Sequence, residues 1–123
     1  MKIRGVDFVM YRVNDIERAV AFYRDVLGLT LEMQSNEHQW AEFACGNVTL
    51  SLFGGSDIAA TGSAARVALA VDDIAAAHAE LAARGVPMGG PPQDWGVCQS
   101  LEVFDPDGNA ILLHQRANGT FGP

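Results

Sequence analysis

The chain has few cysteines, few basic residues and no long apolar run. Cys45 and Cys98 are its only two cysteines, and they stand far apart with no second ligand at zinc-finger spacing. This scarcity excludes a disulfide framework and favours two reduced thiols. No apolar run approaches the ~20 residues that span a bilayer, and the basic start Met1-Lys2-Ile3-Arg4-Gly5 precedes no apolar stretch of the secretory kind. We therefore expect a cytoplasmic protein that is not inserted in a membrane.

Positive charge is also scarce. Eight lysines and arginines stand against fifteen aspartates and glutamates, which gives a formal net charge of −7. Such a field repels phosphate backbones and favours neutral or cationic small partners, although it also serves solubility. The glycine pairs at 54–55 and 89–90 lack the strand-to-helix context of a phosphate-binding loop, and the chain has no nucleophile elbow. The sequence therefore predicts no nucleic-acid partner and identifies no catalytic residue.

The chain does contain one pattern that occurs twice. Five residues recur in the same order at an offset of 58 positions: Val9, Val13, Asp15, Ile16 and Ala19 in the first copy, and Val67, Val71, Asp73, Ile74 and Ala77 in the second. Each copy has the signals of a strand, a polar cap, a helix and a glycine stop. The candidate caps are Asn14 or Asp15 and Asp72 or Asp73, and the stops are Gly28 and Gly85. The chain is predicted to be two copies of one supersecondary unit.

Alternating apolar residues extend each copy into the order βαβββ. In unit one, residues 1–53, the expected strands are 9–13, 29–33, 40–44 and 48–53, and the expected helix is 16–27. In unit two, residues 64–116, the expected strands are 65–71, 86–88, 97–104 and 110–115, and the expected helix is 74–84.

The connecting segments carry turn and loop residues. Residues 54–63 are predicted to be an exposed, mobile linker, 89–96 a loop, and 117–123 a frayed tail. The run Asp105-Pro106-Asp107-Gly108-Asn109 predicts a tight turn between the last two strands, since proline presets the second turn position and glycine adopts the left-handed one.

These features resemble the vicinal oxygen chelate superfamily, which includes glyoxalase I, extradiol dioxygenases, fosfomycin-resistance enzymes and bleomycin-resistance proteins. The resemblance rests on the two βαβββ units, on Ala21-Phe22-Tyr23 and Leu27-Gly28-Leu29, and on the turn at 105–109, and it covers roughly residues 4–116. It implies one α+β domain over residues 1–123, in which eight strands curl into a mixed, cup-shaped sheet with the helices outside. It also implies a homodimer.

In the enzymes of that family a divalent metal is held in the cup by one His or Glu from each of four strands. The resemblance places Phe8, Ser51, Arg66 and Leu112 at these four positions. Phenylalanine and leucine cannot bind a metal, arginine will not, and a serine hydroxyl is a poor lone ligand. We therefore predict no metal and no other cofactor.

The cup would instead have the composition of a small-molecule pocket. Strand alternation gives it a mostly small, apolar lining with a few polar groups. The predicted ligand-binding residues are Phe8, Met10, Trp40, Ser51, Arg66, Trp95, Leu112 and His114. The alternative is a cup closed by its own side chains, which binds nothing.

Several of these residues have two interpretations. Trp95 is either a lid that stacks on a planar or cationic ligand or a plug that holds its loop in place. His114 either contacts the ligand or is an ordinary strand-end or interface histidine. Glu42 and Glu102 are candidates for contacting a positive group, against the usual role of charged strand residues as solvated side chains.

Three functions follow. The first is metal-independent sequestration of a small aromatic or cationic molecule, as the resemblance to antibiotic-resistance proteins of the bleomycin type implies. The second is a glyoxalase-like lyase or isomerase, or a dioxygenase-related enzyme, with a non-standard site in which Arg66 holds an anion and His114 or Glu102 is the acid or base. The third is a structural or regulatory subunit that binds a protein through its sheet surface.

Overall fold

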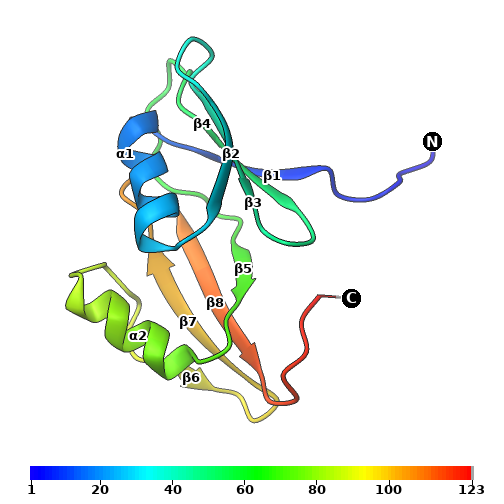
Figure 1. Cartoon of the computed structure of the whole chain (residues 1–123), viewed down its shortest axis with the longest axis vertical. Coiled ribbons are helices and arrows are strands. Elements are labelled where there is room, and N and C mark those ends of the chain that lie inside the picture. Colours follow the sequence, from blue (N-terminus) through cyan, green and yellow to red (C-terminus); the bar gives the residue numbers. More distant parts are fainter. Residues whose placement is uncertain (123) are drawn as a thin grey trace. The chain divides into compact units, whose positions relative to one another are not determined.

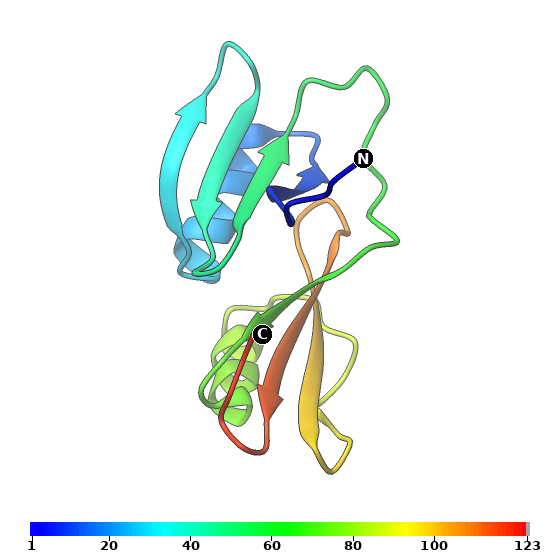
Figure 2. The ribbon, with the colours of Figure 1, turned by 90° about the vertical axis from the view of Figure 1, so that its right-hand side faces the viewer.

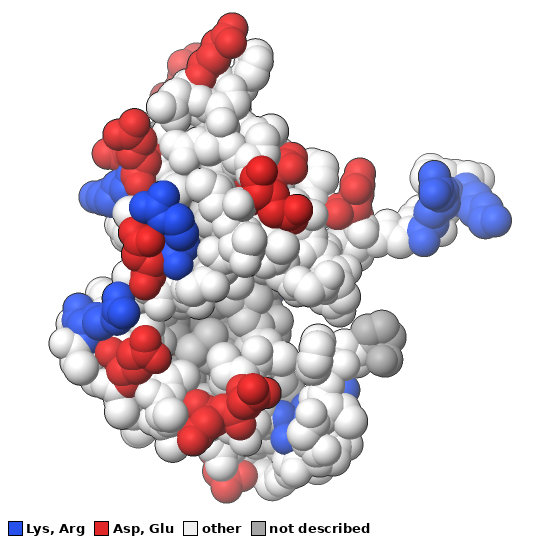
Figure 3. Space-filling model, in the orientation of Figure 1, with Lys and Arg blue, Asp and Glu red and all other residues white. Residues whose placement is uncertain are grey.

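The structure, a computed structural model, describes residues 1–122. The chain divides into two compact units, Met1–Thr61 and Gly62–Pro123, so the division falls inside the expected linker. On the face shown in Figure 3, acidic side chains are spread over several places and not gathered in one patch. In the part of the chain that the structure describes, no helix has the length and apolar character needed to cross a membrane.

Unit one forms a four-stranded mixed sheet with a helical segment on one face (Figure 2). Its elements are β1 (Phe8–Arg12), α1 (Ile16–Ala21), the π-helix η1 (Phe22–Val26), β2 (Thr30–Ser35), β3 (Trp40–Ala44) and β4 (Thr49–Phe53). The strand order is β1-β4-β3-β2, with β1 and β4 parallel and the other neighbours antiparallel.

Unit two repeats this arrangement (Figure 1). Its elements are β5 (Val67–Ala70), α2 (Ile74–Ala83), β6 (Gln93–Asp94), β7 (Cys98–Phe104) and β8 (Ala110–Arg116). The order is β5-β8-β7-β6, and again only the first pair is parallel. The α+β class and the two βαβββ units are therefore confirmed.

The repeat extends to individual hydrogen bonds. The backbone N–H of Val13 donates to the carbonyl of Phe53 at 3.0 Å, and Val71 donates to His114 at the same distance. Asp15 caps α1 by accepting from the Arg18 N–H, and Asp73 caps α2 in the same way. The caps are thus the second residue of each candidate pair.

Each core lies between a helix and one face of its sheet. Tyr11, Tyr23, Phe43 and other fully buried side chains fill the space under α1 and η1, and each such burial contributes about 1.5–3 kcal/mol. Phe8 and Met10 alternate with Tyr11 along β1 and remain 46 % and 42 % exposed. Tyr11 and Val13 are buried on the helix side of the sheet, and Phe8 and Met10 therefore lie on the opposite face.

The first helix differs from the single helix expected over 16–27. From Phe22 onward the backbone N–H groups donate to the carbonyl five residues earlier instead of four, as in the bond from the Leu27 N–H to the Phe22 carbonyl. This extra residue in the turn allows two consecutive rings, Phe22 and Tyr23, to be buried in edge-to-face contact at 5.3 Å. Regular apolar spacing gave no sign of this.

The prediction of a strand at 86–88 is wrong. Only Met88 forms a bridge, to Val103, and a two-residue strand, β6, lies instead in the segment predicted to be loop. Pro87 has no N–H to donate, and it contributes only its carbonyl, which accepts from Phe104.

The segment expected to be a mobile linker is hydrogen-bonded to unit one. The Arg12 guanidinium donates to Ser56 Oγ at 3.0 Å and to the Ile58 carbonyl. The Asn14 amide makes two bonds to the backbone of Ala60, at 2.7 and 2.9 Å. This segment is therefore held against unit one as far as residue 60.

The turn before β8 is held by one buried carboxylate. Asp105, only 4 % exposed, accepts hydrogen bonds from the N–H groups of Asp107 and Asn109 and from Asn109 Nδ2, all at 2.8 to 2.9 Å. Gly108 takes the expected left-handed conformation, with φ of 81°. The predicted turn therefore depends on Asp105 as much as on its glycine.

Replacing Asp105 with alanine should lower the free energy of unfolding by roughly 2–4 kcal/mol, because buried donors lose their acceptor. Asp105→Asn keeps one acceptor oxygen and should cost roughly 1 kcal/mol. Urea denaturation followed by circular dichroism measures both. Asp57→Ala, at an exposed carboxylate, is the control. Equal unfolding midpoints for Asp105→Ala and wild type would contradict this account of the turn.

Candidate functional site

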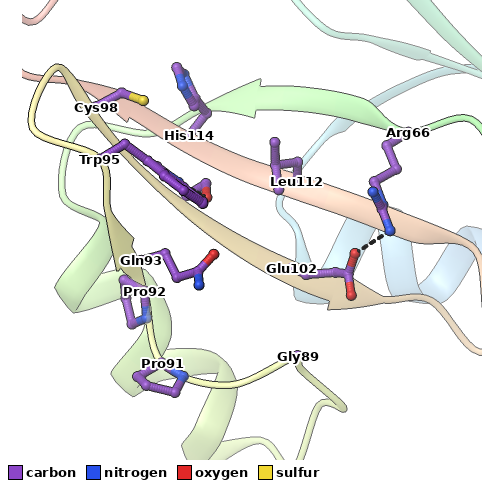
Figure 4. A pocket seen from close by; sticks show the side chains of 11 residues that line it. Arg66, Gly89, Pro91, Pro92, Gln93, Trp95, Cys98, Glu102, Leu112 and His114 are labelled. Carbon is purple, nitrogen blue, oxygen red and sulfur yellow. Dashed lines mark hydrogen bonds and ion pairs between the residues drawn. The ribbon is translucent and has the colours of Figure 1, made fainter.

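Unit two contains a hollow of about 630 Å³ on the sheet face opposite α2 (Figure 4). Two cross-strand pairs, Ser100 with His114 and Glu102 with Leu112, form its floor. Their neighbours Leu101 and Val103 point the other way and are buried. The lining residues are Arg66, Gly89, Pro91, Pro92, Gln93, Trp95, Cys98, Ser100, Glu102, Leu112 and His114.

An ion pair crosses this floor. Arg66 Nη2 lies 2.7 Å from Glu102 Oε2, and Figure 4 shows the two side chains pointing toward one another. The arginine side chain is 54 % exposed and the glutamate 29 %, so solvent screening limits the pair to about 0–1 kcal/mol of stability. Its main effect is to neutralise the Glu102 carboxylate inside the hollow.

Trp95 presents an aromatic surface at the edge of the hollow. Its side chain is 60 % exposed, while its indole N–H donates to Ser100 Oγ at 2.9 Å. Its backbone N–H donates to the Cys98 carbonyl at 2.8 Å. Polar contacts thus hold the loop and leave the ring open, which favours a stacking surface over a buried plug.

The eight predicted ligand-binding residues fall into two sets. Arg66, Trp95, Leu112 and His114 line the hollow of unit two. The other four belong to unit one and lie on the face of its sheet opposite α1: Phe8, Met10, Trp40 and Ser51. Ser51 is completely buried.

The sequence reasoning left Glu102, Ser100 and Cys98 out of the predicted site. The signal was present, because these three alternate along β7 with Leu101 and Val103, but the sequence did not show which of the two sets packs on the helix. Glu102, expected to contact a positive group, has that group within the chain, in Arg66.

The family's metal does not fit the donor set of this chain. The β1–β4 register pairs Met10 with Ser51, and the β5–β8 register pairs Ala68 with Leu112, so Ser51 and Leu112 occupy equivalent places in the repeat, as do Phe8 and Arg66. Three of these four side chains offer no lone pair for a divalent ion. Over residues 1–122, no group of three or more His, Cys, Asp or Glu side chains is placed to hold a metal.

The fold and the hollow define a class of protein built from two βαβββ repeats, with a potential ligand site on the sheet face away from the helix. Residues 5–113 match the model of the Glyoxalase/Bleomycin resistance protein/Dioxygenase superfamily. The chain belongs to this superfamily.

Solved structures of similar fold include both enzymes and binding proteins. A lactoylglutathione lyase from Agrobacterium tumefaciens has 23% identity and a TM-score of 0.77, over 98% of this chain and 100% of that one. The fosfomycin resistance protein FosX from Mesorhizobium loti has 22% identity and a TM-score of 0.70, over 92% of each chain. TnmS3, an antibiotic-binding protein from Streptomyces, has 27% identity and a TM-score of 0.73, over 94% of this chain and 100% of that one. A search of the curated proteins finds no match.

The two thiols lie in different surroundings. Burial raises the pKa of the Cys45 thiol above its ordinary value, against an opposing backbone hydrogen bond from Leu50. Cys98 lines the hollow. A raised pKa leaves less thiolate at a given pH, so burial lowers the reactivity of the Cys45 thiol.

We therefore expect iodoacetamide at neutral pH to alkylate Cys98 several times faster than Cys45, as measured by peptide mass spectrometry over time. In denaturant the two rates should converge, because the burial that suppresses the Cys45 thiolate is lost. Faster modification of Cys45 in the folded protein would contradict this assignment.

Proposed function

We propose that this protein binds a small, planar aromatic molecule in the hollow of unit two without the help of a metal ion. The observation that carries the proposal is the exposed ring of Trp95, fixed through its N–H to Ser100 at the edge of the hollow. The volume of about 630 Å³ lies within the range of small-molecule sites.

The lining offers both an apolar surface for an aromatic ring and polar groups that can orient the ligand. Trp95, Leu112 and the prolines at 91 and 92 supply apolar surface, and stacking on an aromatic ring contributes about 0.5–1.5 kcal/mol beyond the area it buries. Ser100 and His114 supply polar groups that can orient a ligand. The mixture of apolar surface and few polar groups is typical of binding sites.

One protein of similar fold, TnmS3, is an antibiotic-binding protein, which supports a binding function for this fold. The alternative is an enzyme in which Arg66 holds an anion and Glu102 or His114 transfers a proton. All three side chains line the hollow. The ion pair disfavours it, because Arg66 and Glu102 already occupy one another.

Trp95→Ala should weaken the binding of planar aromatic compounds about tenfold. Calorimetry with a panel of fused-ring compounds measures the affinity. Val97→Ala, an exposed residue of the same loop that does not line the hollow, is the matched control. A bound compound should also slow alkylation of Cys98 and leave Cys45 unaffected.

The proposal fails if no compound of the panel binds, or if Trp95→Ala and Val97→Ala bind equally. Chemical conversion of a bound compound that is lost in both Arg66→Ala and His114→Ala would support the enzyme alternative instead.

Metal independence has its own test. Protein stripped with a chelator should bind the same compound with unchanged affinity. Of the four residues at the family's metal-ligand positions, only Ser51 has a side-chain atom that could bind a metal ion. Titration with Mn, Fe(II), Ni and Zn should show no stoichiometric binding at micromolar affinity, which would correspond to about 8 kcal/mol. Stoichiometric binding, or a ligand affinity that a metal restores, would refute it.

A further inference from the structure

The segment that follows β8 joins three polar side chains in one series of hydrogen bonds. The Arg116 guanidinium donates through Nη1 to Thr120 Oγ1 at 3.3 Å, and this hydroxyl donates to Asn118 Oδ1 at 2.7 Å. The backbone N–H of Thr120 donates to the same Oδ1 at 3.1 Å. The carboxamide oxygen of Asn118 therefore accepts two hydrogen bonds, and one of them comes from a hydroxyl that a cation polarises.

The residue after Asn118 is a glycine. Asn118-Gly119 is the only Asn-Gly pair among the five asparagines of the chain, and both residues are exposed. Because glycine has no side chain beside its backbone nitrogen, that nitrogen can approach the carboxamide carbon of the preceding residue without steric hindrance. The segment thus places an unhindered nucleophile next to a polarised carbonyl group.

These contacts match the requirements of asparagine cyclisation. The Gly119 nitrogen loses its proton to water and adds to Cγ of Asn118, so that negative charge develops on Oδ1. The two Thr120 donors lie where this charge forms, as in an oxyanion hole. The Cγ–Nδ2 bond then breaks, and Nδ2 takes up a proton from water and leaves as ammonia. Water opens the resulting succinimide at either carbonyl, which gives isoaspartate or aspartate.

One hydrogen bond opposes the reaction. The backbone N–H of Gly119 donates to the carbonyl of Arg116 at 3.0 Å, and this bond must open before the nitrogen can attack. Residues 117–120 are all exposed, so the bond can open locally without disturbing the core. It therefore slows the cyclisation without preventing it.

We propose that Asn118 is a site of self-modification, where a succinimide formed with Gly119 yields isoaspartate and aspartate, and that Thr120 and Arg116 accelerate its formation. Thr120 contacts the reacting carboxamide directly. Arg116 is a positioning residue, because it acts through the Thr120 hydroxyl. The proposal does not rest on the function proposed for the hollow of unit two.

The modified turn adjoins the loop of Trp95. The backbone N–H of Ala117 donates to the Val97 carbonyl at 2.9 Å, and Val97 belongs to that loop. Isoaspartate adds one carbon atom to the backbone after residue 118, so it should weaken this bond and raise the amide exchange rate of Ala117 severalfold. Hydrogen–deuterium exchange on the separated forms measures the change. Equal rates in both forms would overturn this link to the loop.

Peptide mass spectrometry of the whole protein, incubated in mildly alkaline buffer, measures the reaction. The mass increase of deamidation should appear at Asn118, with isoaspartate and aspartate resolved by chromatography. Asn47, an exposed asparagine followed by valine, is the internal control and should react at least about tenfold more slowly. Gly119→Ala should slow the reaction of Asn118 to a similar extent, because a methyl group hinders the attacking nitrogen. A Cβ at this position meets no atom within 4 Å.

A matched pair of variants tests the role of the hydroxyl. Thr120→Val keeps the size of the side chain and the backbone N–H but removes the hydroxyl, so it should slow the reaction roughly two- to tenfold. Thr120→Ser keeps the hydroxyl and should react as wild type does. Arg116→Gln should slow the reaction by a smaller factor than Thr120→Val. In urea all of these rates should converge, because the hydrogen bonds to Asn118 are lost.

The proposal is overturned if Asn118 reacts no faster than Asn47, or if Thr120→Val and Thr120→Ser react equally fast in the folded protein. A difference between these two variants that persists in urea would also overturn it, because the effect would then come from the local sequence and not from the hydrogen bonds.

Discussion

The packing of one helix against one face of each four-stranded sheet is the constraint on which the rest of this structure depends. Side chains alternate across a strand, so once Tyr11, Phe43 and Leu52 are buried under the first helical segment, their neighbours must line the opposite face. The same holds in unit two, where Leu101 and Val103 are buried and Ser100 and Glu102 line the hollow. The residues that line the hollow are thus a consequence of the core.

The two units share the hydrogen bonds that hold the helix and the strands, but the side chains on the opposite face of the sheet differ between them. Both have a capping aspartate, a parallel first pair of strands and a glutamate at the same place on the third strand. Selection for folding acts on the helix-packed face, where a lost methylene leaves a cavity. The opposite face is free to differ, and it carries Phe8 and Ser51 in one copy and Arg66 and Leu112 in the other.

The sequence alone predicts the features that leave a local or periodic signal, and it misses those that depend on contacts between distant residues. The repeat, the βαβββ order of elements along each unit and the turn at Asp105 all leave local or periodic signals, and each of them was predicted. The π-helix after Ala21, the contacts of the segment after Phe53 and the strand at Gln93–Asp94 depend on tertiary packing and hydrogen bonds between distant residues. Glu102 was named as a candidate but left out of the predicted ligand-binding residues for a related reason. Along β7 the apolar and polar sets alternate, and only the position of α2 shows which set faces the hollow.

The Arg66–Glu102 pair also bears on the function proposed for unit two. A charge partner within the chain is already in place, whereas a free ligand loses translational and rotational freedom when it binds. A ligand that sought either charge would have to open a contact of 2.7 Å, although solvent screening keeps the cost of opening it to about 0–1 kcal/mol. Under the function proposed above, selectivity in the hollow comes chiefly from shape and from stacking on Trp95.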